Sequence, residues 1–193
     1  MTTNSIKSIA VYCGSNTGAG TKYMDSAKEL GTLLAKSGIR LIYGGTHKGL
    51  MGAIADAVLE NGGEAYGVIT ERLLGKGHLH DGLTGHEVTA TMKERKHRMA
   101  QLADAFIGMP GGIGTMEEFL EVWTLNQLGD LDKPPGLFSV DGYFEPFMGF
   151  IDHMIQEAFL PAAHRNSVVV ESDAKALLEG LLSFEKVTVP KWL

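Results

Sequence analysis

Two acidic side chains of the chain stand about one helical turn apart and could take part in acid–base chemistry. Glu118 and Glu121 follow a glycine-rich turn within a stretch of helical periodicity, so their carboxylates would lie on nearly the same helix face. A carboxylate can activate a water molecule or stabilise positive charge on a reacting sugar. Thr115-x-x-Glu118 is also the spacing of a capping box, in which the glutamate serves its own helix start. On spacing alone the cap is the better interpretation, and Glu121 fits a solvated face.

A basic run lies earlier in the chain, between residues 93 and 98. It follows Thr91, a residue type that caps helices, so its charges fall in the first turns of a helix, where the dipole disfavours them. A bound anion would compensate. Arg95 carries a planar fork that can bind phosphate or sugar oxygens in pairs, and Lys96 adds a point charge. Taken alone, the run is equally well explained as a solvated basic face.

Three glycine turns each follow an apolar run and open a helical stretch. They are Cys13-Gly14-Ser15, Gly44-Gly45 and Pro110-Gly111-Gly112-Ile113-Gly114-Thr115. Glycine lets the main chain approach a phosphate closely, and the N–H groups at the start of the following helix favour an anion. Any one turn alone is better explained as a tight loop without a ligand. Three turns at one edge of a parallel sheet instead favour a nucleotide phosphate.

None of these turns matches a common nucleotide fingerprint. The stretch Gly45-Thr46-His47-Lys48-Gly49 lacks both the spacing and the Lys-Ser/Thr ending of a P-loop. Glu117 stands where the dinucleotide pattern that begins at Gly112 requires its third glycine, and this turn follows a late strand. Triphosphate hydrolysis and NAD binding therefore have little support.

Short apolar runs alternate with helical stretches along the whole chain, which indicates βαβ units. The runs are nearly continuous, as in a parallel sheet that is buried on both faces. We therefore predict an α/β fold, a Rossmann-like doubly wound parallel sheet in a three-layer sandwich. The predicted strands are Ser8–Cys13, Ile39–Tyr43, Glu64–Ile69, Ala105–Met109, Gly136–Val140 and Val168–Glu171. The predicted helices are Lys22–Lys36, Leu50–Asn61, Thr91–Leu102, Thr115–Leu128, Tyr143–Phe159 and Asp173–Leu182.

The length of 193 residues and the absence of a linker or repeat predict a single domain over residues 1–193. The least regular stretch, Glu71–Val88, is interpreted as a loop over the edge of the sheet. Its histidines, with Asp81, lack the spacing of a helical metal-binding pair, so we expect no metal site there. Cys13 has no evident partner base and is expected to pack in the core.

The composition excludes several classes of protein. A net charge of −6 argues against a protein that coats nucleic acid or an anionic membrane, and no apolar run approaches the length of a membrane span. The single cysteine and the polar start Met1–Ser8 favour a cytoplasmic location. The predicted helix Tyr143–Phe159 is apolar on more than one face, so we expect a homodimer.

Several motifs together make the chain resemble a known family. Pro110 to Glu118 fits the pattern PGGxGTxxE of the Lonely Guy family, the cytokinin-activating phosphoribohydrolases, and the segment from Met92 to Met99 resembles its MxxRKxxM segment. The agreement covers nearly the whole chain. It extends over Cys13-Gly14-Ser15, Tyr43-Gly44-Gly45, Gly49-Leu50-Met51-Gly52, Leu83-Thr84, Gln127-Leu128-Gly129, Lys133-Pro134 and Asp141-Gly142-Tyr143.

The resemblance implies hydrolysis of the N-glycosidic bond of an N6-substituted adenosine 5′-monophosphate, giving a free base and ribose 5-phosphate. It implies no metal or organic cofactor, and a dimer with the pocket near the subunit interface. By resemblance, Glu118 is catalytic, Arg95 is catalytic or orients the substrate, and Lys96 binds substrate, while the N–H groups of residues 111–117 and Thr115 hold the phosphate. Glu121, one helical turn after Glu118, is a second catalytic candidate that assists, touches the sugar or belongs to the solvated face. The substrate-binding set comprises Gly14, Ser15, Gly44, Gly45, Met92, Lys96, Pro110, Gly111, Gly112, Ile113, Gly114, Thr115 and Glu117.

Two departures from the family pattern concern the base pocket. Family members often carry Trp at the position of Leu125, whereas this chain has Trp123, and a Glu often found near Gly77 is missing. Trp123 and Phe119 are themselves better explained as core or interface. Two rival functions remain: a non-catalytic carrier of molybdenum cofactor or nucleotide with the same fold, and a pyridoxal-dependent decarboxylase, for which no Schiff-base lysine arrangement is evident.

Overall fold

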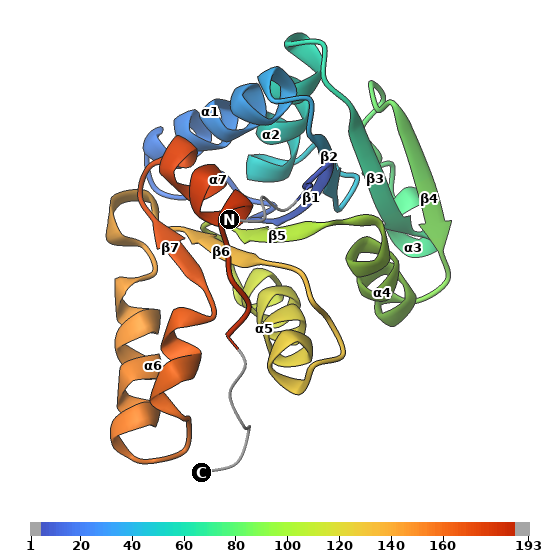
Figure 1. Cartoon of the computed structure of the whole chain (residues 1–193). Coiled ribbons are helices and arrows are strands. Elements are labelled where there is room, and N and C mark those ends of the chain that lie inside the picture. Colours follow the sequence, from blue (N-terminus) through green and yellow to red (C-terminus); the bar gives the residue numbers. More distant parts are fainter. Residues whose placement is uncertain (1–4, 188–193) are drawn as a thin grey trace.

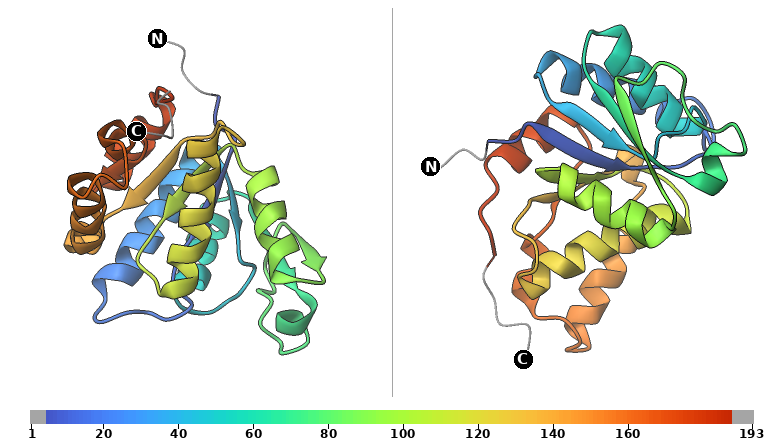
Figure 2. Two further views of the ribbon diagram at one scale, coloured as in Figure 1. Left: turned by 90° about the horizontal axis from the view of Figure 1, so that it is seen from below. Right: turned by 90° about the vertical axis from the view of Figure 1, so that its right-hand side faces the viewer.

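A seven-stranded parallel sheet forms the centre of the computed structural model, which describes residues 5–187, and helices cover both faces of the sheet (Figures 1 and 2). The predicted α/β, Rossmann-like, three-layer architecture is confirmed. The predicted single domain 1–193 and the polar start Met1–Ser8 each include residues outside the described range. Among the described residues, no helix is both long and apolar enough to cross a membrane.

The helices and strands follow one another along the chain in alternation. The strands are β1 Ser8–Tyr12, β2 Arg40–Tyr43, β3 Ala65–Thr70, β4 Gly85–Thr89, β5 Ala105–Gly108, β6 Pro135–Phe138 and β7 Val169–Glu171. The helices are α1 Lys22–Lys36, α2 Gly49–Glu60, α3 Glu71–Leu74, α4 Met92–Leu102, α5 Ile113–Leu128, α6 Glu145–Gln156 and α7 Ala174–Leu182, with short 3₁₀ helices at Val140–Gly142 and Ala162–Asn166.

The strand order reverses at the middle of the sheet. The strands lie in the order β4-β3-β2-β1-β5-β6-β7, so β1 pairs with β2 on one side and with β5 on the other. Ala10 of β1 is in register with Ile42 of β2 and with Phe106 of β5. Every residue of β1, β5 and β6 is buried, which explains their continuous apolar runs. This reversal point is where open α/β sheets bind ligands.

Two helical layers enclose the sheet. Helices α1, α2 and α7 lie on one face, and α4, α5 and α6 lie on the other (Figure 1). In α1, Ala27, Leu30 and Leu34 recur at helical spacing and are fully buried. Gly31 lets α1 approach α2 closely, because a Cβ there would stand 2.6 Å from the carbonyl oxygen of Ile54. The close packing of α1 on α2 holds α2 in place, and the beginning of α2 borders the site described below.

The stretch Glu71–Val88 differs from its prediction as a loop. It contains the short helix α3 and the strand β4, which pairs in parallel with β3 from Tyr66 opposite Gly85 to Thr70 opposite Thr89. Residues of β4 alternate between half-buried and exposed, since this strand lies at the edge of the sheet, and such alternation lacks the apolar run by which the inner strands are recognised.

The predicted helix Tyr143–Phe159 is also shorter in the structure. Helix α6 begins at Glu145 and ends at Gln156. A 3₁₀ turn precedes it, with Asp141 at φ 50°, and Ala158 has φ 62°, a left-handed conformation that a continuing helix does not adopt.

Candidate active site

The three glycine turns meet at the point where the strand order reverses. The N–H of Gly14, after β1, donates to the carbonyl of Pro110, after β5, over 3.0 Å. The N–H of Leu50, at the start of α2, donates to the carbonyl of Gly14 over 3.0 Å. Gly111 is required here because a Cβ would stand 2.1 Å from Thr115 Oγ1 and 2.9 Å from the nitrogen of Gly14. The turns therefore pack directly on one another.

A cavity of about 820 Å³ opens above these turns. Its volume lies in the range of small-molecule sites. Most of the predicted site residues line it, namely Gly14, Ser15, Gly44, Met92, Arg95, Pro110, Gly111, Gly112, Gly114, Thr115, Glu117 and Glu118. Gly45, Lys96, Ile113 and Glu121 do not line it.

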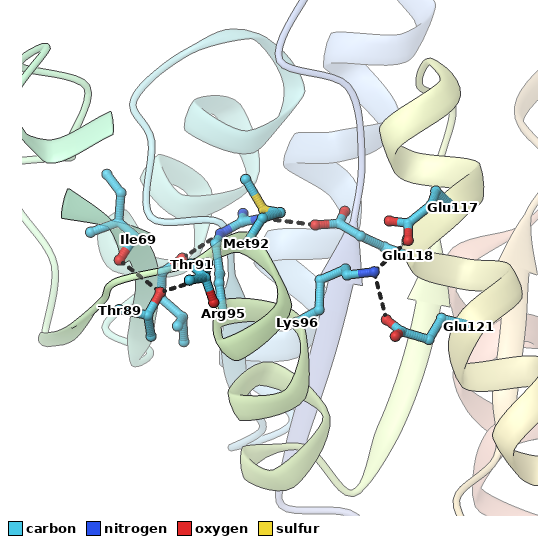
Figure 3. A network of polar contacts seen from close by, with 10 residues as sticks. Ile69, Thr89, Thr91, Met92, Arg95, Lys96, Glu117, Glu118 and Glu121 are labelled. Carbon is cyan, nitrogen blue, oxygen red and sulfur yellow. Dashed lines mark hydrogen bonds and ion pairs between the residues drawn. The ribbon is translucent and has the colours of Figure 1, made fainter. Parts of the chain in front are cut away.

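A buried ion pair joins α4 to α5 at the wall of the cavity. Nη1 of Arg95 donates to Oε1 of Glu118 over 2.8 Å, and the side chains are only 5% and 9% exposed (Figure 3). Nε of Arg95 donates to the carbonyl of Val68 over 2.7 Å, and the sulfur of Met92 lies 3.3 Å from Nη1. These contacts hold the guanidinium in one position. Arg95 is therefore not part of a solvated basic face.

Gly44 makes room for the guanidinium. A Cβ at position 44 would stand 2.2 Å from Nη2 of Arg95 and 3.0 Å from the sulfur of Met51. Any larger residue at this turn would therefore displace the arginine. Gly45 serves the turn itself, since its φ is 76°, a value that L residues rarely adopt.

Burial and Arg95 act on the pKa of Glu118 in opposite directions. Burial raises the pKa of its carboxyl above the ordinary value, and the charge and hydrogen bond of Arg95 offset part of that rise. Burial, together with the negative charge of Glu118, raises the pKa of Tyr12 and of Cys13 well above their usual ranges. Cys13 is thus a protonated thiol, and its predicted place in the core is confirmed.

The starts of α4 and α5 settle which residues act as caps. Thr91 and Glu94 form a reciprocal capping box at α4, with Glu94 N donating to Thr91 Oγ1 over 3.2 Å. Helix α5 instead begins after Gly112, with no side-chain cap, and Glu118 lies inside it, bonded to Arg95. The capping interpretation of Thr115-x-x-Glu118 is therefore wrong, because the turn begins the helix two residues earlier than the predicted helix Thr115–Leu128.

Lys96 and Glu121 lie beside the cavity. The ammonium of Lys96 pairs with Glu117 and, over 3.1 Å, with Glu121, so α4 and α5 are joined a second time (Figure 3). The Lys96 side chain is 13% exposed, and those of Glu117 and Glu121 are 54% and 41% exposed. Desolvation opposes the charge on Lys96, but its two hydrogen-bonded carboxylates raise its pKa overall.

The start of α5 offers backbone donors to an anion, because the first N–H groups of a helix have no partner within it. The expected donor set of residues 111–117 is too long, since the N–H of Met116 already donates to the carbonyl of Gly112 over 3.2 Å. The first turn carries no acidic residue, and a Cβ at Gly112 or Gly114, which both line the cavity, would meet nothing within 4 Å. Tyr143 contributes to the rim by donating its hydroxyl to the carbonyl of Gly111 over 2.6 Å.

Several lining residues were not among the predicted site residues. Lys48 belongs to the second glycine turn, so the shared pattern of three turns could have found it, whereas His78 falls in the stretch interpreted as a loop and has no such signal. The others are Cys13, Asn16, Gly18, Tyr23, Thr46, Leu50, Met51, Leu73 and Tyr143.

The two departures from the family pattern fall in different places. Trp123 is buried against Phe119 and donates its ring N–H to Ser167 over 2.8 Å, so it belongs to the core, as does Phe119. Leu125 lines a second, separate hollow on the outer side of α5. His78, next to Gly77, does line the main cavity.

The histidine-rich stretch does not gather metal ligands. His80 pairs with Asp56 over 2.8 Å. Within residues 5–187, no group of three or more His, Cys, Asp or Glu side chains is arranged to hold a metal ion.

Solved structures of other proteins share the fold. The molybdenum cofactor carrier protein of Chlamydomonas reinhardtii matches with a TM-score of 0.67 at 22% identity, over 90% of this chain and 93% of that one. The molybdenum cofactor binding protein of Rippkaea orientalis matches with a TM-score of 0.65 at 24% identity, over 89% and 93%. At these identities the likeness concerns the fold alone.

Sequence comparison identifies the family. The family model "Possible lysine decarboxylase" matches residues 51–181. The cytokinin riboside 5′-monophosphate phosphoribohydrolase of Rhodococcoides fascians is 42% identical over 92% of this chain and 90% of its own length. The enzyme of that name from Arabidopsis thaliana, LOG1, is 42% identical over 96% and 89%. The chain therefore belongs to the family of the cytokinin riboside 5′-monophosphate phosphoribohydrolases.

Proposed function

We propose that this chain hydrolyses the N-glycosidic bond of adenosine 5′-monophosphates, including N6-substituted ones, to release the free base and ribose 5-phosphate. The observation that carries the proposal is the buried Arg95–Glu118 pair in the wall of the cavity that the glycine turns also line. Relatives of the chain that have a similar length are named for this activity.

The 5′-phosphate binds at the start of α5. Its donors are the N–H groups at the start of α5 that precede Met116, the hydroxyl of Thr115 and the turn at Gly14 and Ser15. The positive end of the helix dipole attracts the phosphate. Glu118 lies in the second turn of the same helix, so a phosphate held here brings the ribose toward its carboxylate.

Glu118 acts on the anomeric carbon. As the bond from C1′ to the base nitrogen breaks, its electron pair leaves with the base and positive charge develops on the ribose ring. The carboxylate stabilises this charge and accepts a proton from the attacking water, whose oxygen bonds to C1′. The departing base takes up a proton, so a water molecule is consumed overall. Because burial raises the pKa of Glu118, its carboxylate is a better proton acceptor than an ordinary exposed carboxylate.

Arg95 orients Glu118 and favours its ionised form, which offsets part of the effect of burial on its pKa. It contacts the carboxylate through Nη1 and is itself anchored by Val68. We assign Lys96 and Glu121 a supporting role from outside the cavity, with Lys96 holding Glu117 and Glu121 on α5. Met92 contributes a cavity wall and packs its sulfur against Arg95.

The test is product formation by purified protein. Incubation with AMP and with N6-isopentenyl-AMP should yield free base by liquid chromatography, and Glu118→Gln and Arg95→Ala should each remove turnover while circular dichroism stays unchanged. Asp152→Asn is the matched control, since Asp152 pairs with Arg165 over 2.8 Å and does not line the cavity. Near-normal turnover in Glu118→Gln would refute the assigned role.

The rival functions give different results in the same experiment. A carrier would bind a pterin or nucleotide in calorimetry and release no base. A decarboxylase would show the visible absorbance of pyridoxal phosphate after reconstitution.

We further propose that the chain forms a homodimer. The outer side of α5 carries a hollow of about 500 Å³ lined by Ile113, Met116, Leu120 and Leu125, and Ile113 is 90% exposed. The predicted contact through Tyr143–Phe159 offers Phe150, which is 55% exposed on α6. Sedimentation of Leu120→Glu and Phe150→Glu distinguishes the two faces: the variant that becomes monomeric marks the interface. A cytoplasmic location and the absence of nucleic acid partners stay predictions.

A further inference from the structure

A pair of short segments builds one wall of the cavity from basic residues. Lys48 lies just before α2 and His78 lies between α3 and β4, and both line the cavity. His47 and Lys76 belong to the same two segments but do not line the cavity; we call His47, Lys48, Lys76 and His78 together the basic wall. It is made by elements other than α5, whose start is assigned to the 5′-phosphate.

The backbone holds the basic wall in place. Thr46 and Leu79 form an antiparallel bridge, the N–H of His47 donates to the carbonyl of His78 over 3.3 Å, and the N–H of His80 donates to the carbonyl of Gly45 over 2.9 Å. These contacts tie the second glycine turn to the segment after α3. The wall is therefore organised before any ligand binds, which lowers the entropic cost of binding.

The charges of the basic wall have no acidic partners. Within residues 5–187, none of the four side chains forms an ion pair, although His80 nearby pairs with Asp56. Desolvation by burial lowers the pKa of His78, and the positive charges of Lys48, His47 and Lys76 lower it further. The lowered pKa favours the neutral form of His78, so Lys48 and Lys76 supply the positive charge of the wall, and no acidic side chain among residues 5–187 pairs with either lysine.

The start of α2 adds to this positive charge. Lys48 occupies the position before the helix without capping it, and the first turn contains no acidic residue. A cation at the positive end of a helix is unfavourable unless an anion is present. The N–H groups of Leu50 and Met51 both point to the carbonyl of Gly14, at 3.0 and 3.4 Å, so the side chains of the wall would have to supply the contacts to such an anion.

The cavity has room for a substrate that reaches both anion-binding regions. It is large for a small-molecule site, and Met51, Leu73 and Met92 contribute apolar surface to its lining. Resting on the proposed function, we propose that the basic wall binds a second anionic group of the substrate, separate from the 5′-phosphate. An AMP whose N6 substituent ends in a carboxylate carries such a group.

Steady-state kinetics with four substrates tests this inference. AMP is compared with N6-isopentenyl-AMP, N6-carboxymethyl-AMP and ADP, in the wild-type chain and in Lys48→Met. We expect kcat/KM for N6-carboxymethyl-AMP to exceed that for N6-isopentenyl-AMP, and Lys48→Met to reduce it about tenfold while AMP changes less than about twofold. ADP carries its second phosphate on the first, so a preference for ADP over N6-carboxymethyl-AMP would place the second anion beside the 5′-phosphate and overturn the inference. Lys28→Met, which removes an exposed lysine from α1, is the control and should change nothing.

A binding measurement separates failure of the inference from failure of the proposed function. In the Glu118→Gln background, calorimetry should show tighter binding of N6-carboxymethyl-AMP than of N6-isopentenyl-AMP, with the difference lost on adding Lys48→Met. If AMP is hydrolysed and Lys48→Met affects all substrates equally, the inference is wrong and the proposed function stands. If no base is released from any substrate but the charge-dependent binding persists, the proposed function fails and the second anion site remains.

Discussion

Helix α4 and the basic wall both concentrate positive charge at the cavity, but they treat it in opposite ways. In α4, Arg95 pairs with Glu118, Lys96 with Glu117 and Glu121, and Arg98 with Glu87. In the basic wall no cation has an acidic partner among the described residues. Internal pairing fixes side chains before substrate arrives, as catalysis requires, whereas unpaired charge leaves its neutralisation to a ligand. We therefore assign bond cleavage to the paired side chains of α4 and substrate selection to the unpaired basic wall.

Removing the arginine from the paired region should have the largest effect. Arg95→Met leaves Glu118 buried without its cation, which costs about 3–5 kcal/mol of stability. Because Arg95 lowers the pKa of Glu118, that pKa rises further in the variant. A raised carboxyl pKa in the folded state is destabilising above that pKa, and the loss is relieved as pH falls through it. Urea unfolding should therefore show a larger deficit at pH 8 than at pH 5.

The double variant Arg95→Met/Glu118→Leu is the control for that experiment. It removes the unpaired carboxylate, so it should recover part of the stability at pH 8 and show little dependence on pH. A deficit of Arg95→Met that is the same at both pH values would show that packing, not the buried charge, sets its stability.

Displacing Arg95 without removing it should have the second-largest effect. Gly44→Ala places a Cβ against Nη2 of Arg95, so the guanidinium has to move and kcat should fall about 10²-fold. Gly149→Ala in α6 is the matched control, because a Cβ there meets nothing within 4 Å and α6 lies away from the cavity. Equal rates for the two variants would mean that Arg95 tolerates displacement.

The second link between α4 and α5 should matter less. Lys96→Met breaks a pair whose carboxylates are largely exposed, so the loss of stability should stay below about 1 kcal/mol. The charge of Lys96 also lowers the pKa of Glu118, so the acid limb of the kcat/KM profile should move to higher pH. Arg98→Met breaks a comparable pair with Glu87 and should leave the limb in place. If the acid limb of the profile stays in place in Lys96→Met, Lys96 only links α4 to α5 and does not tune Glu118.

The smallest expected change concerns the unpaired region and is read by NMR titration of His78. Lys48 is the foremost charged residue that lowers the pKa of His78, so Lys48→Met should raise it. Binding of an anion at the basic wall should raise the same pKa in the wild-type chain. If neither change moves the titration, the field of the wall is already neutralised by solvent ions.

The sequence predicted the centre of the fold better than its edge. The inner strands are buried on both faces, so they appear as apolar runs, whereas β4 alternates in burial and α3 has only four residues. Helix starts depended on turn chemistry: Thr91 caps α4 as expected, but Gly112 begins α5 without a side-chain cap.

In the candidate site, short-range patterns were readable and long-range contacts were not. The glycine turns, Arg95 and Glu118 belong to local motifs, and the structure places them around one cavity. The pairing of Lys96 with two glutamates could not be read from spacing, because residues 96, 117 and 121 meet only after α4 and α5 pack. Likewise the segments that carry Lys48 and His78 are joined by the isolated backbone bridge between Thr46 and Leu79, and such a bridge leaves no pattern in the sequence.

The bridge between Thr46 and Leu79 is antiparallel, while every pairing between the named strands is parallel. It brings the segment between α3 and β4 to the cavity without making that segment part of the sheet. Mutation, insertion or exchange there can change which substrates the pocket admits while helices α4 and α5, which carry Arg95 and Glu118, keep their positions. Separate stretches of the chain thus carry substrate preference and bond cleavage, so changes in the segment between α3 and β4 can alter the preference while the cleavage chemistry stays the same.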